Sequence, residues 1–400
     1  MSANDNAIVV INAGSSSLKF SVFVEEKASG NLNVFCNGQI SGIGTEPRFD
    51  AKNADRKVIA DRSWPAGENP DRQRLLSFLI GWIEGHLGGA RLVGAGHRVV
   101  HGGRRFHDPV MIDDEVMTEL ERLIPLAPLH QPHNLAAIKA LAGAHAELPQ
   151  VACFDTAFHF YKPEVAARFA LPRALTEEGV RRYGFHGLSY EYIARTMPTL
   201  EPALADGRIV VCHLGSGASM CGIHAGKSMD SSMGFTAVDG LPMGTRTGNL
   251  DPGVLLYLMR EKKMTADDLE RLLYHKSGLL GVSGISNDMR VLLESNEPAA
   301  KEAIDLFVFR IVKELGALAA SIGGLDAVVF TAGIGERSSP IRRMVCERAA
   351  WMGIKLDEAA NDANALRIST PDSPLSVWVV PTDEERMIAL HTLEVLNGGA

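Results

Sequence analysis

The stretch Ile8-Val9-Val10-Ile11-Asn12-Ala13-Gly14-Ser15-Ser16-Ser17 is repeated, with substitutions, as Ile209-Val210-Val211-Cys212-His213-Leu214-Gly215-Ser216-Gly217-Ala218. Each copy begins with a β-branched run typical of a buried strand, continues into a turn of small residues, and is followed by an alternating second strand. Glycine and serine let a backbone approach an anion closely, and successive N–H groups in such a turn form a concave site for it. Two such hairpins predict a nucleotide bound between two halves of the chain.

Length and composition favour a soluble protein of two domains. The 400 residues exceed the size at which one core keeps growing, and the repeat puts a domain boundary near residue 156. A net charge of −8 argues against a nucleic-acid partner. The chain shows no apolar run long enough for a membrane span and no signal peptide, so we expect a cytoplasmic protein. The five cysteines contain no C-x-x-C pair and predict buried thiols in a reducing compartment.

The pattern of apolar residues predicts a mixed α/β fold in both halves. Expected elements of the first half are strands at 7–12, 18–25, 34–41, 57–61, 91–101 and 151–155, and helices at 75–87, 113–124 and 133–146. Expected elements of the second half are a hairpin from 208, helices at 251–262, 265–275 and 299–321, strands at 327–331 and 376–381, a glycine loop at 333–338, and a helix at 384–396. Thr382 and Glu385 predict a capping box for that last helix.

The glycine loops do not complete either familiar nucleotide motif. Gly226-Lys227-Ser228 supplies the end of a Walker loop, but Cys221 stands at its first glycine position. The turns at 215–220 and 333–338 both lack the last glycine of G-x-G-x-x-G. An ordinary tight turn explains each loop alone. Three such loops together favour a nucleotide site of another kind.

Several polar residues are candidates for chemistry beside that nucleotide. Arg98, predicted on a strand with Val100 on the same face, suits a carboxylate clamp, or else reaches solvent from an edge strand. Asp155 ends a buried strand, where sites in open sheets gather, or else caps a turn. His186 lies between Phe185 and Gly187, either free to approach a ligand or held as a structural hydrogen-bonding group.

Taken together, these segments resemble the acetokinase family of the actin-like ATPase superfamily, over essentially the whole chain. The resemblance rests on eight motifs that occur in the family's order: residues 12–19, 96–103, 127–130, 154–159, 182–187, 213–217, 243–246 and 333–336. Several separate matches are far more specific than any single glycine loop.

The resemblance implies an α/β fold of duplicated actin-like, ribonuclease H-like domains, with mixed sheets flanked by helices and an active-site cleft between them. Residues 1–156 with 385–400 would form the first domain, and residues 157–384 the second. It also implies reversible transfer of the ATP γ-phosphate to acetate, giving acetyl phosphate and ADP. The family uses Mg²⁺, with Mn²⁺ as an alternative, and acts as a homodimer without nucleic-acid or membrane partners.

Site residues carry over position by position from the family's motifs. Those with catalytic roles are Asp155, His186, Arg246 and His130. Those that bind substrate are Arg98, Val100, Leu129, Phe185 and Ala237. Those that contact the nucleotide are Lys19, His213, Leu214, Gly215, Ser216, Gly217, Asp288, Met289, Arg290, Gly333, Ile334, Gly335, Glu336 and Arg337. Asn12 and Glu384 match the metal-site residues.

Two positions depart from the family pattern. Ser216 stands where many members have Asn, which keeps a hydrogen-bonding group but shortens it. Ala237 stands where the family has proline in the substrate pocket. Because alanine is smaller, we expect some tolerance of propionate.

Three other functions remain open. A propionate or butyrate kinase would share every phosphate-binding motif, and only pocket residues such as Val100 favour acetate. A sugar kinase would need several polar groups in an otherwise apolar pocket. A non-enzymatic nucleotide switch would not need Arg98, His186 and Arg246 together.

Since a carboxylate is ionised at pH 7, no strong base is required, and Asp155 is better suited to orient a metal or water.

Overall fold

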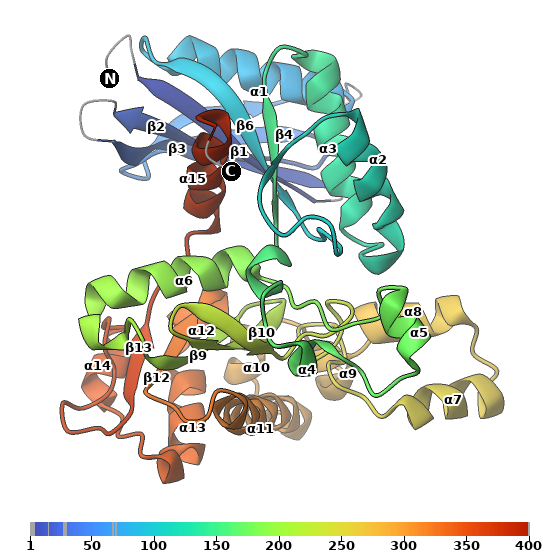
Figure 1. Ribbon diagram of the computed structural model, residues 1–400, viewed down its shortest axis with the longest axis vertical. Coiled ribbons are helices and arrows are strands. Elements are labelled where there is room, and N and C mark those ends of the chain that lie inside the picture. Colours follow the sequence, from blue (N-terminus) through green and yellow to red (C-terminus); the bar gives the residue numbers. More distant parts are fainter. Residues whose placement is uncertain (1–4, 15, 27–29, 66–67, 69, 399–400) are drawn as a thin grey trace. The chain divides into compact units, whose positions relative to one another are not determined.

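The computed structural model describes residues 5–14, 16–26, 30–65, 68 and 70–398, so Ser15 of the first turn lies outside the described residues. The chain forms two compact units (Figure 1). Unit 1 comprises residues 1–157 and 383–400, and unit 2 comprises residues 158–382.

Unit 1 is built on an eight-stranded sheet with the order β5-β4-β3-β2-β1-β6-β8-β7. Its strands are β1 (Asn6–Ala13), β2 (Ser17–Glu26), β3 (Asn31–Ser41), β4 (Arg48–Asn53), β5 (Val58–Ser63), β6 (Arg91–Val99), β7 (Val110–Met111) and β8 (Gln150–Phe154). The hairpin predicted from residues 8–17 is confirmed, since β1 and β2 pair antiparallel. β6 and β8 then continue the sheet in parallel on the other side of β1.

Helices cover the sheet of unit 1. They are α1 (Arg72–His86), α2 (Asp114–Arg122), α3 (Gln131–Ala144) and the C-terminal α15 (Glu384–Leu396). Leu75, Leu76, Leu79 and Ile80 of α1 join a core with the buried faces of β1 to β4. α15 packs on β1, β6 and β8 (Figure 1). Gly96 permits a close approach of this helix, because an added Cβ there would lie 2.3 Å from Thr392 Oγ1.

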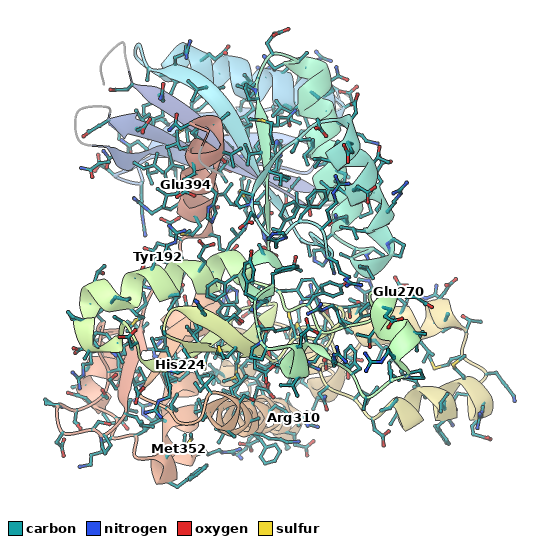
Figure 2. The ribbon with its side chains drawn as sticks, in the orientation of Figure 1. Tyr192, His224, Glu270, Arg310, Met352 and Glu394 are labelled. Carbon is teal, nitrogen blue, oxygen red and sulfur yellow. The ribbon has the colours of Figure 1, made fainter. Side chains whose placement is uncertain are left out.

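Unit 2 is built on a five-stranded sheet with the order β11-β10-β9-β12-β13. Its strands are β9 (Arg208–Leu214), β10 (Ala218–His224), β11 (Lys227–Ser231), β12 (Ala327–Thr331) and β13 (Ser376–Val379). Its longer helices are α6 (Gly187–Leu200), α7 (Pro252–Glu261), α8 (Ala266–His275), α11 (Pro298–Ser321) and α13 (Ser339–Arg348). Shorter ones are α4 (Glu164–Ala167), α5 (Arg173–Glu177), α9 (Gly278–Ser283), α10 (Met289–Glu294), α12 (Ala332–Arg337) and α14 (Glu358–Asp362). In each unit, side chains fill the space between the sheet and its helices (Figure 2).

The two sheets share one topology. In unit 1, β3, β2 and β1 pair antiparallel in sequence, and β6 and β8 follow in parallel. In unit 2, β11, β10 and β9 pair antiparallel, and β12 and β13 follow in parallel. The five-strand core therefore occurs twice, which confirms the duplicated mixed-sheet fold predicted from the repeated hairpin.

The two hairpin turns differ in length, although their sequences align without a gap. In unit 1 the ladder closes at Ala13 and Leu18 around residues 14–17, whereas in unit 2 it closes at Leu214 and Ala218 around residues 215–217. Because one residue of slip moves every side chain of a strand to the other face, the alignment is misleading for the second strand. Lys19 lies opposite Asn12, but it is Ser219, and not the aligned Met220, that lies opposite His213.

Other local predictions were wrong at element ends. The strand expected at 91–101 stops at Val99, so Val100 does not share a strand face with Arg98. Residues 332–337 form the short helix α12 in place of a glycine loop. α15 is capped by Asp383, whose Oδ1 accepts from the N–H of Arg386 at 2.9 Å, and not by the expected capping box. Strand β4 and helix α6 were not predicted at all.

The cysteine prediction is confirmed in its structural part. Cys36, Cys153, Cys212, Cys221 and Cys346 are all buried and carry free thiols. Burial raises the pKa of Cys36, Cys221 and Cys346 to about 12, so these thiols stay protonated. Within the described residues, no helix combines the length and apolar character needed to cross a bilayer.

Candidate active site

In unit 1 the candidate residues gather at one edge of the sheet. Asn12 lies near the carboxyl end of β1, Arg98 near that of β6, and Asp155 directly after β8. These three strands are parallel neighbours, and the backbone N–H of Asp155 donates to Val99 O at 3.1 Å. Glu384, the first residue of α15, reaches the same edge. We call Asn12, Arg98, Asp155 and Glu384 the unit 1 group; it lies where ligands bind in open α/β sheets.

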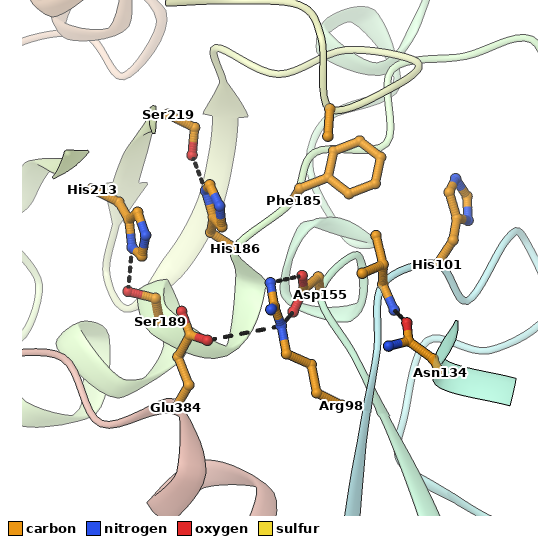
Figure 3. A network of polar contacts seen from close by, with 12 residues as sticks. Arg98, His101, Asn134, Asp155, Phe185, His186, Ser189, His213, Ser219 and Glu384 are labelled. Atoms are coloured by element: carbon orange, nitrogen blue, oxygen red, sulfur yellow. Dashed lines mark hydrogen bonds and ion pairs between the residues drawn. The ribbon is translucent and has the colours of Figure 1, made fainter. Parts of the chain in front are cut away.

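Arg98 makes a two-pronged ion pair with Asp155 (Figure 3). Its Nε donates to Oδ1 at 3.0 Å and its Nη2 donates to Oδ2 at 2.6 Å, while Glu384 Oε2 lies 3.8 Å from Nε. The side chain of Arg98 is 20% exposed and that of Asp155 only 2%. Burial alone would lower the pKa of Arg98, but the charges of Asp155 and Glu384 outweigh burial and raise it above its ordinary range. The guanidinium is therefore a permanent cation, fixed in direction by a buried carboxylate.

Two buried amides hold the neighbouring segment. Asn134 of α3 accepts from the N–H of Val100 at 3.2 Å and donates to Ala13 O at 3.1 Å. Gln131 accepts from the N–H of His101 at 3.2 Å and donates back to its carbonyl at 3.1 Å. The start of α3, which follows Leu129 and has His130 as its N-cap residue, is thus tied to the ends of β1 and β6. Val100 is 4% exposed, while Leu129 and His130 are half-buried.

The oxygen ligands of the unit 1 group suit a magnesium ion that arrives with a nucleotide. Among the described residues, no group of three or more His, Cys, Asp or Glu side chains forms a ready metal cage. Mg²⁺ does not need one, because it is usually held by one or two carboxylates, waters and substrate phosphates. Burial and the nearby charges of Asp383 and Glu384 raise the pKa of Glu385. A cation beside Glu384 would relieve this crowding of negative charge.

In unit 2 a histidine and an arginine converge on the second hairpin turn. A Cβ added to Gly217 would lie 3.6 Å from Nε2 of His186 and 3.9 Å from Nη1 of Arg246. The same Nη1 donates to the carbonyl of Ala237 at 3.1 Å. The N–H of Gly244, in the loop that carries Arg246, donates to Ser216 O at 3.1 Å. We call His186, Gly217 and Arg246 the unit 2 group; it offers two positively polarised side chains beside an open backbone turn.

Buried polar side chains hold the backbone on the N-terminal side of His186. His186 is in the left-handed region at φ 56° and begins α6. Nε2 of His159 contacts Phe185 O at 2.9 Å, and Nζ of Lys162 donates to Tyr183 O at 3.1 Å. Burial lowers the pKa of His159 to about 3, so its ring is neutral and Nε2 carries the hydrogen that it donates to the carbonyl. These contacts fix a backbone conformation that is uncommon outside glycine.

Asp288, Met289 and Arg290 follow a residue that lies beside the Arg246 loop. A Cβ added to Gly244 would lie 3.3 Å from Asn287 O, which puts the residue before Asp288 beside the Arg246 loop. Asp288 caps α10 through the N–H of Arg290 at 2.9 Å and pairs with its guanidinium at 2.6 Å. The hydrogen bond from this side chain lowers the pKa of Asp288 to about 2. Met289, between these two residues in the chain, is buried.

Helix α12 supplies the last candidates, Gly333 to Arg337. It follows β12 directly, and a Cβ added to Gly335 would lie 3.4 Å from Cys212 O of β9. The buried guanidinium of Arg342 donates to Gly335 O at 2.9 Å. Gly333 and Arg337 are exposed, whereas Ile334 and Glu336 are half-buried. A glycine at 335 thus permits close packing of the helix on the sheet.

Sequence reasoning missed several residues that hold the site. Gln131, Asn134, His159, Lys162 and Ser219 act through contacts with segments distant in sequence. The one available signal was that His159 belongs to the motif at 154–159. The four residues expected to line the substrate pocket also divide between the units: Val100 and Leu129 belong to unit 1, and Phe185 and Ala237 to unit 2.

Comparison with known proteins shows the family of this chain. The model of the acetokinase family matches residues 7–390. The chain is 56% identical over 397 residues to an acetate kinase of Rhodopseudomonas palustris, covering 98% of this chain and 99% of the relative. A solved acetate kinase of Porphyromonas gingivalis has 36% identity and a TM-score of 0.86, covering 98% of this chain and 100% of that one. A propionate kinase of Francisella tularensis has 33% identity and a TM-score of 0.88, covering 98% and 99%. The chain belongs to the acetokinase family.

Proposed function

We propose that the protein transfers the γ-phosphoryl group of ATP to acetate, reversibly and in one direct in-line step, forming acetyl phosphate and ADP. The observation that carries this proposal is the convergence of His186 Nε2 and Arg246 Nη1 on Gly217. A phosphoryl group in transfer spreads negative charge over three equatorial oxygens, so catalysis needs positioning and positive charge more than covalent chemistry. The unit 2 group supplies both.

The unit 1 group suits the acceptor. Acetate is already ionised at pH 7, and the barrier is therefore repulsion between two anions and not the removal of a proton. Arg98 is a permanent cation held in direction by Asp155, and its Nη1 makes no hydrogen bond to another described residue. In our proposal this amino group receives the acetate carboxylate, and Val100 and Leu129 contact the methyl group.

In our proposal, Asn12 and Glu384 hold Mg²⁺ together with the phosphates of ATP, and Lys19, opposite Asn12 in the ladder, contacts the nucleotide. When bound, the ion neutralises charge on the β- and γ-phosphates. In our proposal the turn at His213 to Gly217 and helix α12 also contact the nucleotide.

The test of the reaction is acyl phosphate formation, trapped as the hydroxamate, from ATP with acetate, propionate, butyrate or glycerol. We expect hydroxamate from acetate, less from propionate, and no ATP turnover with glycerol. Turnover of glycerol, or ATP hydrolysis without any hydroxamate, would refute the proposal. Preference for propionate over acetate would instead favour the activity named for the Francisella relative.

Arg246→Ala separates transition-state from ground-state binding. We expect kcat to fall about 10²–10³-fold with little change in the KM for acetate, because Arg246 contacts the transferring group and not the acid. Arg310→Ala, on α11 in the same unit, is the matched control and should keep wild-type kinetics. A large rise in KM with kcat unchanged would assign Arg246 to substrate binding.

We further propose that the protein is a homodimer whose contact includes α7. Six of its ten residues are apolar, yet none is buried, and Leu256, Tyr257 and Met259 are 52%, 53% and 47% exposed. A short helix that buries no apolar face gains little from packing, so a second copy of the chain is the expected cover. Light scattering should give twice the chain mass, and Leu256→Glu should give a monomer where Val165→Glu does not. A wild-type monomer would overturn this proposal.

A further inference from the structure

A chain of buried hydroxyl groups ends on the catalytic candidate His186. Ser219 Oγ lies 2.8 Å from Nδ1 of His186, and Tyr190 Oη lies 2.5 Å from Ser219 Oγ (Figure 3 shows the first contact). Ser219 and Tyr190 are both fully buried. Ser219 comes from β10, whereas Tyr190 and His186 come from the start of α6. Nothing in the proposed reaction requires either hydroxyl group to touch a substrate.

The imidazole of His186 is also fixed in its plane. Its ring stacks on that of His213 with centroids 4.1 Å apart and an interplanar angle of 13°. The ring of His213 is in turn held by Ser189, whose Oγ lies 2.9 Å from Nδ1. With Nδ1 at Ser219 and the ring stacked on His213, the nitrogen beside Gly217 is Nε2.

Hydrogen-bond chemistry gives this chain a direction. A phenol is a stronger donor than an aliphatic alcohol, and the unprotonated nitrogen of a neutral imidazole is a stronger acceptor than a hydroxyl oxygen. These strengths favour donation from Tyr190 to Ser219 and from Ser219 to Nδ1 of a neutral His186. A neutral imidazole that accepts at one nitrogen carries its hydrogen on the other.

We propose that Ser219 and Tyr190 are positioning residues that keep the hydrogen of His186 on Nε2, where it can donate to the transferring phosphoryl group. The phosphoryl role rests on the proposed function, but the position of the hydrogen is a property of the protein without substrates. With the hydrogen on Nδ1, Nε2 would present a lone pair to an anion and oppose the reaction. Groups that fix a histidine tautomer have large effects on rate elsewhere, about 10⁴-fold in the serine protease triad.

The position of Ser219 supports a functional role. Ser219 lies opposite His213 in the hairpin of unit 2, as Lys19 lies opposite Asn12 in the hairpin of unit 1. The duplicated fold thus puts Ser219 at the place that holds the proposed nucleotide-contacting lysine in the other copy. The three-residue turn of unit 2 makes this possible, because a turn of four residues would put Met220 there.

The test combines ¹⁵N NMR of labelled histidines with steady-state kinetics. In the free wild-type protein we expect His186 to show a protonated Nε2 and an unprotonated, hydrogen-bonded Nδ1. Ser219→Ala should move the hydrogen partly or fully to Nδ1 and lower kcat at least tenfold, with the KM for acetate changed less than about threefold. Tyr190→Phe, which removes one oxygen atom, should give the same pattern to a smaller extent, and Ser219→Thr should restore the wild-type tautomer.

Tyr192→Phe, on the same helix, is the matched control and should change neither readout. A hydrogen on Nδ1 in the wild type, or an unchanged tautomer in both Ser219→Ala and Tyr190→Phe, would overturn the inference. Because the NMR measurement needs no turnover, it decides this point even if no acyl phosphate is formed. If Ser219→Ala does not fold, Tyr190→Phe alone decides it.

Discussion

Gly217→Ala is the substitution that most sharply separates folding from catalysis in this protein. The added methyl group would lie 3.6 Å from His186 Nε2 and 3.9 Å from Arg246 Nη1, which are ordinary van der Waals distances. The φ angle of Gly217 is not positive, so alanine can adopt its backbone conformation. We therefore expect the variant to fold, with the free energy of unfolding changed by no more than about 0.5 kcal/mol.

The same methyl group occupies the space that the transferred phosphoryl group needs. Hydrogen bonds from His186 and Arg246 require an oxygen at about 2.9 Å from each nitrogen, and a methyl carbon in that space keeps the oxygen away. Loss of one such donor costs about 10²–10³ in kcat, or about 2.7–4 kcal/mol. We expect kcat for acetyl phosphate formation to fall at least 10²-fold.

The assay is the hydroxamate trap at saturating ATP and acetate, alongside denaturant unfolding. Gly316→Ala serves as control, because this glycine lies in α11 and an added Cβ there meets nothing within 4 Å. It should keep full activity and gain about 0.5–1 kcal/mol of stability. If Gly217→Ala keeps kcat within threefold of the wild type, the phosphoryl group does not lie between His186 and Arg246.

Three further predictions concern specificity and pH. Ala237→Pro should lower kcat/KM for propionate relative to acetate, and the wild-type ratio should stay below a thousandfold, because one methylene is worth about 1–3 kcal/mol in such a pocket. Burial and nearby Arg182 lower the pKa of Lys162 to about 8 from 10.5. Between pH 8 and 10, Lys162 is therefore protonated in the unfolded chain and largely neutral in the folded protein. The free energy of unfolding of the wild type, measured by urea titration relative to Lys162→Met, should rise over this pH range by about 2–3 kcal/mol. Burial also lowers the pKa of His97 to about 4. As the pH falls from 6.5 to 5, His97 therefore becomes protonated in the unfolded chain before it does so in the folded protein. The free energy of unfolding of the wild type should fall over this range by about 2 kcal/mol more than that of His97→Asn. Equal losses in the two proteins would assign the acid sensitivity to other groups.

The hairpins were predictable because their signal is local. A β-branched run followed by a turn of small residues determines a strand and its end, and both copies formed as expected. Their register was not predictable, since it depends on turn length, which two gap-free sequences do not reveal. The identity of the residue opposite His213 therefore came only from the structure.

The site shows the same division between local and distant information. The positions of Arg98 and Asp155 at strand ends followed from their flanking apolar runs. Their mutual ion pair did not, because 57 residues separate them and each side chain had a plausible alternative role, solvent exposure for Arg98 and turn capping for Asp155. Helix α6 was missed because its sequence contains Pro198 and two tyrosines, which weaken a helical pattern that tertiary packing then restores.

The central claim, direct transfer of phosphate from ATP to acetate, is tested most directly by the stereochemistry at phosphorus. The γ-phosphoryl group is made chiral with ¹⁶O, ¹⁷O and ¹⁸O, and the acetyl phosphate formed from acetate is analysed by ³¹P NMR. A single in-line displacement predicts inversion of configuration. Retention, which two successive transfers produce, or the absence of any acetyl phosphate would contradict the account.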